Sequence, residues 1–197
     1  GEQSWFIKDI GFDTYKKILS EAIEELKENE FKELYSSEDS GPKEFVKEVQ
    51  IDTDFEILYP DHYINAISER LNLYNELATI ENEEDLQAYE HRLVDRFGEL
   101  PIPAVDLMDS VRIKWLAKEL GLERVILKQK RMIGYFVSDQ QSEFYQTEAF
   151  TRVLKYVQRN SKTVVMKEKQ TKSGLRLLIT FIRIDSVKTA LEILKKI

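Results

Sequence analysis

The residue types that most often carry catalysis or bind metals are scarce in this chain of 197 residues. It has no cysteine and only two histidines, His62 and His91. Without cysteine the chain can form no disulfide, thiolate nucleophile or cysteine-ligated cluster. Two histidines are too few for a multi-histidine metal site. Because both have charged neighbours, we interpret them as surface residues, and we expect no metal.

A run of carboxylates, Glu83-Glu84-Asp85, has the chemistry for acid–base catalysis or cation binding. It directly follows Asn82, and asparagine is a favoured residue at the position before a helix. The helix dipole stabilises negative charge in the first turn. The run therefore predicts a helix that begins after Asn82 rather than a catalytic or metal site.

Motifs that bind nucleotides or activate a nucleophile are absent from the sequence. The seven glycines form neither the GxxxxGK[ST] loop that cradles phosphates nor the GxGxxG dinucleotide fingerprint. The GxSxG turn that presents a nucleophilic serine is missing as well. An enzyme needs a base, a nucleophile or a metal gathered in a pocket. We therefore expect no catalytic residues and no cofactor in this chain, which we do not take for an enzyme.

Charge is distributed unevenly along the chain. Residues 1–122 carry 13 basic and 29 acidic side chains, whereas residues 123–197 carry 16 basic and 7 acidic ones. Such an asymmetry points to a nucleic-acid partner or to a charged protein partner. The basic half interleaves cations with the aromatic residues Tyr135, Phe136, Phe144, Tyr145 and Phe181. Its cations are Lys128, Lys130, Arg131, Lys162, Lys167, Lys169, Lys172, Arg176 and Arg183.

Two interpretations of the basic half stay open. A sheet that presents cations and aromatic rings can bind single-stranded nucleic acid through phosphate contacts and base stacking. Alternatively, strand aromatics belong to a core, and lysine and arginine are the polar residues of a one-sided sheet and its edges.

Apolar periodicity predicts the elements of the acidic half. Residues 13–34 predict a helix, residues 35–46 have the composition of a linker, and residues 47–58 alternate as in a strand. Three helices should follow over residues 62–121. The first, over 62–80, carries a stripe that we expect to be buried: Ile64, Ile67, Leu71, Tyr74 and Ala78.

The second of these helices is predicted over residues 83–97 and ends at Gly98, and the third runs from Pro101 to Leu120 and ends at Gly121. The basic half predicts two β-β-α units. Their strands are expected over 123–129, 131–138, 162–169 and 175–183, and their helices near 148–159 and over 186–196. The predicted fold class is therefore α+β, an antiparallel sheet covered by helices. No apolar run approaches the length of a membrane span.

Several motifs together resemble the C-terminal part of the bacterial transcription-repair coupling factors, the Mfd family. Near the start these are Gly1-Glu2-Gln3-Ser4, Ile10-Gly11-Phe12-Asp13-x-Tyr15 and Leu19-x-Glu21-Ala22-Ile23. Further on they are Leu58-Tyr59-Pro60-Asp61-x-Tyr63-Ile64, Arg70-Leu71-x-Leu73-Tyr74 and Leu93-Val94-Asp95-Arg96-Phe97-Gly98-x-Leu100-Pro101. Their order and spacing match over roughly residues 1–121.

The resemblance implies that this chain is a piece of a large ATP-dependent DNA translocase that displaces stalled RNA polymerase and recruits UvrA. Residues 1–34 would be the helical tail of the upstream motor lobe, residues 35–46 a linker, and residues 47–197 the C-terminal regulatory domain. In the family this domain docks on the UvrB-homology module of the same protein, hides its UvrA-binding surface and restrains the motor. The setting would be cytoplasmic, and DNA would be held by the motor rather than by this chain.

Four charged residues on the predicted helix 83–97 are the candidate partner interface. A helix end explains Phe97 and Gly98, but it leaves Asp95 and Arg96 of the same motif unexplained, so these two are assigned to the interface by the resemblance. Glu90 and Arg92 are added because they lie within two turns of them.

Overall fold

The protein is described by a computed structural model that covers residues 44–197, and these residues form a helical block and a five-stranded sheet. The helix expected over 13–34 and most of the expected linker lie outside the described residues. Val46, at the end of that linker, is 2% exposed and belongs to the hydrophobic core that the sheet shares with its covering helices. The division of the chain at residues 34 and 47 stays a prediction.

The helical block consists of α3 (Ile67–Ala78), α4 (Glu83–Phe97) and α5 (Ile102–Glu119). Asn82 begins α4 as predicted: its side-chain oxygen accepts a hydrogen bond of 2.8 Å from the Asp85 backbone N–H. Gly98 ends α4 with a φ of 88°, a conformation that favours glycine. The predicted bounds of α4 are confirmed because both ends carry a local signal.

The sheet has the strand order β1-β2-β3-β5-β4. Its strands are β1 (Gln50–Thr53), β2 (Leu122–Lys128), β3 (Arg131–Phe136), β4 (Val164–Thr171) and β5 (Gly174–Ile182). Strands β2 to β5 pair antiparallel, but β1 lies parallel to β2. The reason is that the whole helical block connects β1 to β2, and a long crossover brings the chain back in the same direction. The α+β fold class is confirmed, with this one difference in strand direction.

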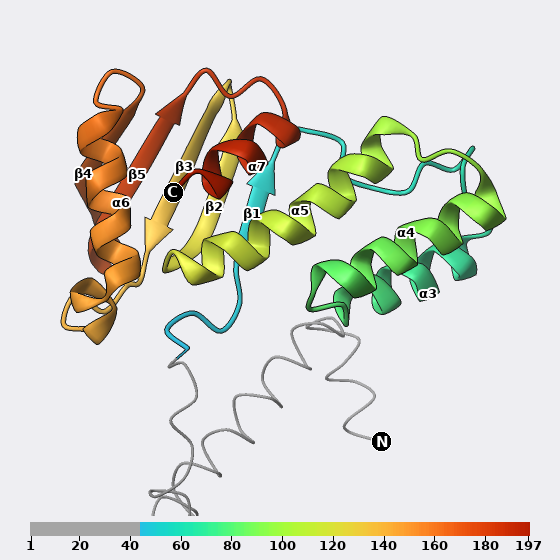
Figure 1. The fold of residues 1–197 in the computed structure, drawn as a ribbon, viewed down its shortest axis with the longest axis horizontal. Helices are drawn as coiled ribbons and strands as arrows, with labels where there is room; N and C mark the ends of the chain where they lie inside the picture. The colour runs from blue at the N-terminus through green and yellow to red at the C-terminus, as the bar shows by residue number, and fades with distance from the viewer. Residues whose placement is uncertain (1–43) are drawn as a thin grey trace, which may run out of the picture. The chain divides into compact units, whose positions relative to one another are not determined.

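Three helices cover one face of the sheet (Figure 1): α5, α6 (Glu148–Arg159) and α7 (Val187–Lys195). A short 3-10 helix, η1 (Glu143–Gln146), precedes α6. The two predicted β-β-α units are thus present. Beneath the helices lies a core to which β2, β3 and β5 contribute Val125, Leu127, Met132, Phe136, Ile179 and Phe181.

Helix α5 joins two hydrophobic clusters. Its first half places Ala104 and Met108 in the helical block, whereas its second half places Ile113 and Ala117 against the sheet. An ordinary amphipathic helix has one apolar stripe, but a helix between two cores must present apolar residues on different sides at its two ends.

The stripe expected to be buried on the first helix is wrong for three of its five residues, because Ile67, Leu71 and Ala78 are exposed. Ile67 and Leu71 are 67% and 57% exposed, while α3 buries Leu73 and Leu77 instead. The hydroxyl of Tyr89 on α4 donates a hydrogen bond of 2.9 Å to the Leu73 carbonyl, which fixes the side of α3 that meets α4. The helix has two apolar sides, and packing against α4 selects the one that the periodicity analysis did not choose.

Candidate functional site

The candidate interface lies on α4, and the helix positions it by burying one side. Leu86, Tyr89 and Leu93 face the core of the helical block. The four predicted residues therefore lie on the remaining sides of the helix. They do not form one cluster, because the side chains of Arg92, Arg96 and Glu90 form ion pairs with neighbouring helices, whereas that of Asp95 forms none among the described residues.

Arg92 and Arg96 reach across to α3. The Arg92 guanidinium lies 2.6 Å from the Glu76 carboxylate, and Arg96 pairs with Glu69. Arg96 also stacks over the Phe97 ring, with 4.9 Å between the guanidinium carbon and the ring centre. Both arginine side chains remain more than 60% exposed. They are held in position by α3 and still accessible to a partner.

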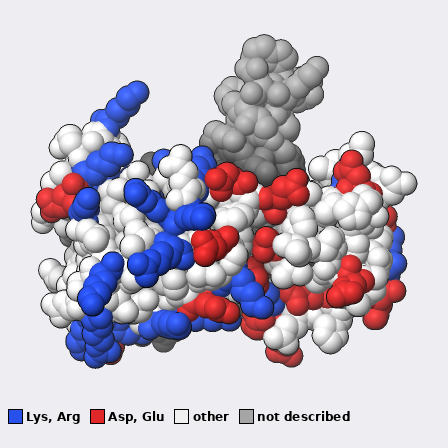
Figure 2. Space-filling view, turned by 90° about the horizontal axis from the view of Figure 1, so that it is seen from above, with Lys and Arg blue, Asp and Glu red and all other residues white. Residues whose placement is uncertain are grey.

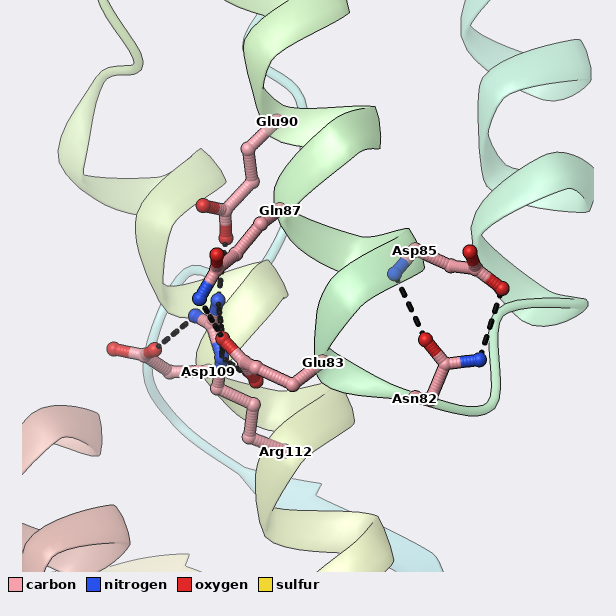
Figure 3. Close-up of polar contacts among 7 residues, drawn as sticks. All are labelled: Asn82, Glu83, Asp85, Gln87, Glu90, Asp109 and Arg112. Carbon is pink, nitrogen blue, oxygen red and sulfur yellow. Dashed lines mark hydrogen bonds and ion pairs between the residues drawn. The ribbon is translucent and has the colours of Figure 1, made fainter.

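Glu90 points the other way, to Arg112 on α5 (Figure 3). The Arg112 guanidinium contacts Glu83 at 2.8 Å, Glu90 at 2.9 Å and Asp109 at 3.0 Å. The arginine side chain is 16% exposed, so this cluster joins α4 and α5 in a partly buried setting. Glu90 has a structural role here that the sequence did not reveal.

Two carboxyl groups in or beside the Arg112 cluster have shifted pKa values. Hydrogen bonding to Arg112 holds the pKa of the Glu83 carboxyl below its usual range. Burial, and then the charge of Asp109, raises the pKa of Asp106. Sequence reasoning missed Arg112, although one signal was available: Asp109 and Arg112 are spaced i,i+3 on a helix of apolar character.

Asp95 is the one of the four whose side chain has no polar partner among the described residues. Its side chain is exposed, and among residues 44–197 that carboxylate forms no hydrogen bond or ion pair. Neither the helix end nor the packing of α3 and α5 accounts for a carboxylate at this position. Asp95 is therefore the residue of the motif that is most available to a partner.

The other motif residues that carry the resemblance hold the chain against α4. Tyr59 is 1% exposed, and its hydroxyl donates a hydrogen bond of 2.6 Å to the Tyr89 hydroxyl. Burial raises the pKa of Tyr89 to about 12, so this pair stays neutral near pH 7. The Tyr63 hydroxyl donates to the Gly98 carbonyl at 2.8 Å, which anchors the end of α4. These contacts fix α4 in place without using Asp95.

Within the described residues, no group of three or more histidine, cysteine, aspartate or glutamate side chains has the arrangement to hold a metal ion. None of the helices described for residues 44–197 has the length and apolar character needed to cross a membrane.

Comparison with known proteins identifies relatives of this chain. Residues 53–147 match the family model of the TRCF domain. The transcription-repair-coupling factor of Staphylococcus epidermidis is 29% identical over 188 residues, which cover 90% of this chain and 15% of the relative. That of Escherichia coli K12 is 31% identical over 127 residues, 63% of this chain and 10% of the relative. The chain thus spans a small part of these relatives.

A solved structure shares the fold. It is the crystal structure of the C-terminal domain of a transcription-repair coupling factor, with a TM-score of 0.53 and 19% identity, and the match covers 75% of this chain and 87% of that one. The family match runs from the end of β1 through the helical block and the β2–β3 hairpin. These matches confirm the resemblance predicted from the motifs: the chain belongs to the TRCF domain family of the transcription-repair coupling factors.

Proposed function

We propose that this chain is a non-catalytic, autoinhibitory interaction domain of a transcription-repair coupling factor. In this proposal it docks through α4 on the UvrB-homology module of the same protein and masks the surface that UvrA binds. It also restrains the ATP-dependent DNA translocase that displaces stalled RNA polymerase. The setting is the bacterial cytoplasm, where transcription takes place, and DNA is contacted by the motor of the parent protein.

The charged end of α4 carries this proposal. Asp95 is exposed and unpaired among the described residues, while Arg92 and Arg96 are oriented by Glu76 and Glu69 and remain largely exposed. Side chains that are already ordered lose little rotamer entropy when a partner binds. Charges placed in this way favour a specific and reversible interdomain contact.

The proposal is tested by measuring the affinity of the chain for the isolated UvrB-homology module by calorimetry. We expect Asp95→Lys to raise Kd by about tenfold, equivalent to about 1.4 kcal/mol. Glu119→Lys is the matched control: it makes the same change of charge at an exposed position near the end of α5 and should leave Kd unchanged. Equal affinities for the Asp95 variant and the unmodified chain would refute the interface.

Arg96 needs a second variant because it also pairs with Glu69 within the domain. Arg96→Glu alone removes both that pair and any contact with the partner. The double variant Arg96→Glu with Glu69→Arg restores an internal pair with the charges exchanged. If Arg96 binds the partner, the double variant should remain weak in binding, whereas recovery of the affinity would assign Arg96 to the internal pair alone.

A further inference from the structure

The face of the sheet opposite α5, α6 and α7 carries apolar and basic residues in an arrangement that the fold does not require. Helices α5, α6 and α7 cover one face (Figure 1), and alternate residues of the strands point to the other, which we call the open face. The strand register sorts the open face into rows that run across the strands. Val165 and Ile182 on this face are 44% and 38% exposed.

Across β2, β3, β5 and β4 the central row of the open face is apolar except for one threonine, and on the edge strand β1 the row ends at Asp52, whose carboxylate pairs with Arg124. Strand pairing places Ile126 opposite Ile133, Ile133 opposite Thr180, and Thr180 opposite Val165. Neighbouring strands lie about 4.8 Å apart, so this row is about 14 Å long. An α-helix of about 10 residues, lying across the strands, would cover that length.

Basic side chains flank this row on both sides. On one side the register pairs Lys128 with Arg131, and on the other it places Arg124 beside Tyr135, with Lys167 two strands further along. Each flanking row lies two residues, about 6.7 Å, from the central one. The flanking rows also hold Ile182 on the first side and Leu178 on the second, so the cations lie toward their ends. An apolar row with cations on both flanks is complementary to a helix that has one apolar stripe and acidic flanks.

Most of these cations have no acidic partner. Lys128, Arg131 and Lys167 form no ion pair among the described residues, and neither does Lys169, while Arg124 pairs with Asp52 and Arg176 with Glu123. Lys128 and Arg131 are like charges directly opposite each other, an arrangement that destabilises a strand pair. A bound anionic partner would remove that repulsion.

The end of the sheet next to Lys128 and Arg131 carries further positive charge and has an unusual backbone conformation. The β2–β3 turn contributes Lys130, and Arg183 follows β5; the Lys130 carbonyl accepts a hydrogen bond of 2.9 Å from the Ile184 N–H, so the two segments are adjacent. Gln129, Lys130 and Arg183 all have positive φ, which is unfavourable for residues with side chains. Figure 2 shows lysine and arginine side chains gathered over the sheet part of the molecule.

Aromatic rings, which a single-stranded nucleic acid would need for stacking, are scarce on this face. Phe136, Phe144 and Phe181 are buried in the core, as in the second interpretation of the basic half. Tyr135 is on the open face, but Arg124 and Arg176 each lie 5.6 Å from its ring centre. The exposed apolar residues are aliphatic, which favours protein side chains over bases.

From these observations we propose that the open face binds an acidic amphipathic helix of a partner protein. The apolar stripe of that helix would lie on Ile126, Ile133 and Val165. Its carboxylates would contact Lys128 and Arg131 on one flank and Lys167 on the other. This surface is separate from α4 and so is independent of the proposed docking on the UvrB-homology module.

The experiment uses the full chain and a fluorescein-labelled peptide of about 14 residues, in which leucine recurs every three or four positions and glutamate fills the flanks. Binding is followed by fluorescence anisotropy as salt is raised. We expect Lys128→Glu with Arg131→Glu to weaken binding at least about tenfold, since two close charge contacts become repulsive. Lys188→Glu with Lys196→Glu, on exposed positions at α7, is the matched control and should retain the affinity.

Further variants and probes separate the explanations. Val165→Thr with Ile182→Thr keeps β-branched residues in the strands and should weaken peptide binding several-fold. If the charge-reversed pair does not fold by circular dichroism, Lys128→Gln with Arg131→Gln takes its place. Asp95→Lys should leave peptide binding unchanged, which distinguishes this surface from the α4 interface. Failure to bind the peptide would overturn the proposal, and binding of an oligothymidylate in its place would assign the face to nucleic acid.

Discussion

At the scale of single residues, Arg112 is the group on which several carboxylates depend. Its guanidinium bonds Glu83, Glu90 and Asp109, and the Asp109 side chain is only 9% exposed. Removing one partner of a buried charge group leaves the others without compensation, which is strongly destabilising. The Arg92–Glu76 pair on the other side of α4 is exposed, and pairs of that kind contribute little.

Arg112→Met keeps much of the side-chain volume and the helix propensity but removes the charge. We expect the free energy of unfolding to fall by about 2–3 kcal/mol, because Asp109 and Glu90 lose their counter-charge. Urea unfolding measures this change. Arg92→Met is the matched control and should cost less than about 1 kcal/mol; equal losses for the two variants would contradict the role given to Arg112.

The acid range offers a second measurement on the same cluster. Glu83 has a lowered pKa in the folded state, so its contribution to stability is present above its unfolded pKa and is lost as the pH falls through its folded pKa. In Arg112→Met that contribution is absent. The difference in unfolding free energy between the two proteins should therefore shrink as the pH is lowered, and a constant difference would argue against this coupling.

At the scale of elements, Gly121 connects α5 to β2 under two constraints. Its φ is +73°, and a Cβ atom at this position would lie 2.2 Å from the Phe144 ring. Phe144 is 1% exposed and belongs to the sheet core. The glycine is thus required both by the backbone conformation and by the ring that packs against it.

Gly121→Ala should destabilise the protein by about 2–4 kcal/mol, from the unfavourable φ and from overpacking together. Thermal unfolding followed by circular dichroism measures the loss. A double-mutant cycle with Phe144→Leu separates the two contributions. The alanine should cost less in the Phe144→Leu background, and an unchanged cost would mean that the ring contact contributes nothing.

At the scale of the whole described unit, α5 links the helical block to the sheet. Residues of one helix belong to both hydrophobic clusters, so neither cluster can lose its packing without affecting the other. The unit also separates its surfaces: α4 offers the candidate docking site, and the open face of the sheet offers cations around an apolar row. Acidic side chains gather over the helical part and basic ones over the sheet part (Figure 2).

This linkage is tested with one substitution in each cluster. Leu86→Ala lies in the helical block and Val125→Ala in the sheet core, and both residues are fully buried. We expect each to lower the urea midpoint, with losses of about 2–4 and 1–3 kcal/mol, respectively. Trp115 fluorescence, recorded in a Trp5→Phe background, and circular dichroism should report the same transition in both variants. Separate midpoints from the two signals would show that the clusters unfold independently.

The sequence by itself determined the features that have local causes. Asn82 and Gly98 cap the two ends of α4. Thr147, whose hydroxyl accepts a hydrogen bond from the Phe150 N–H, caps the start of α6. The motifs around Leu58 and Leu93 identified the family for the same reason, since they are read along the chain. The two β-β-α units were also predictable from alternation and turns.

Only the tertiary structure decided which apolar side a helix such as α3 buries and which charged side chains form ion pairs between helices. Periodicity shows that α3 has apolar sides, but contact with α4 selects Leu73 and Leu77 and leaves Ile67 and Leu71 exposed. Glu90 meets Arg112, which lies 22 residues further along the chain, and Arg96 meets Glu69. Such pairs depend on helix packing rather than on spacing along one helix. The same packing shows that Asp95 alone of the four predicted residues remains unpaired among the described residues, and strand register assembles the cations and aliphatic residues of the open face.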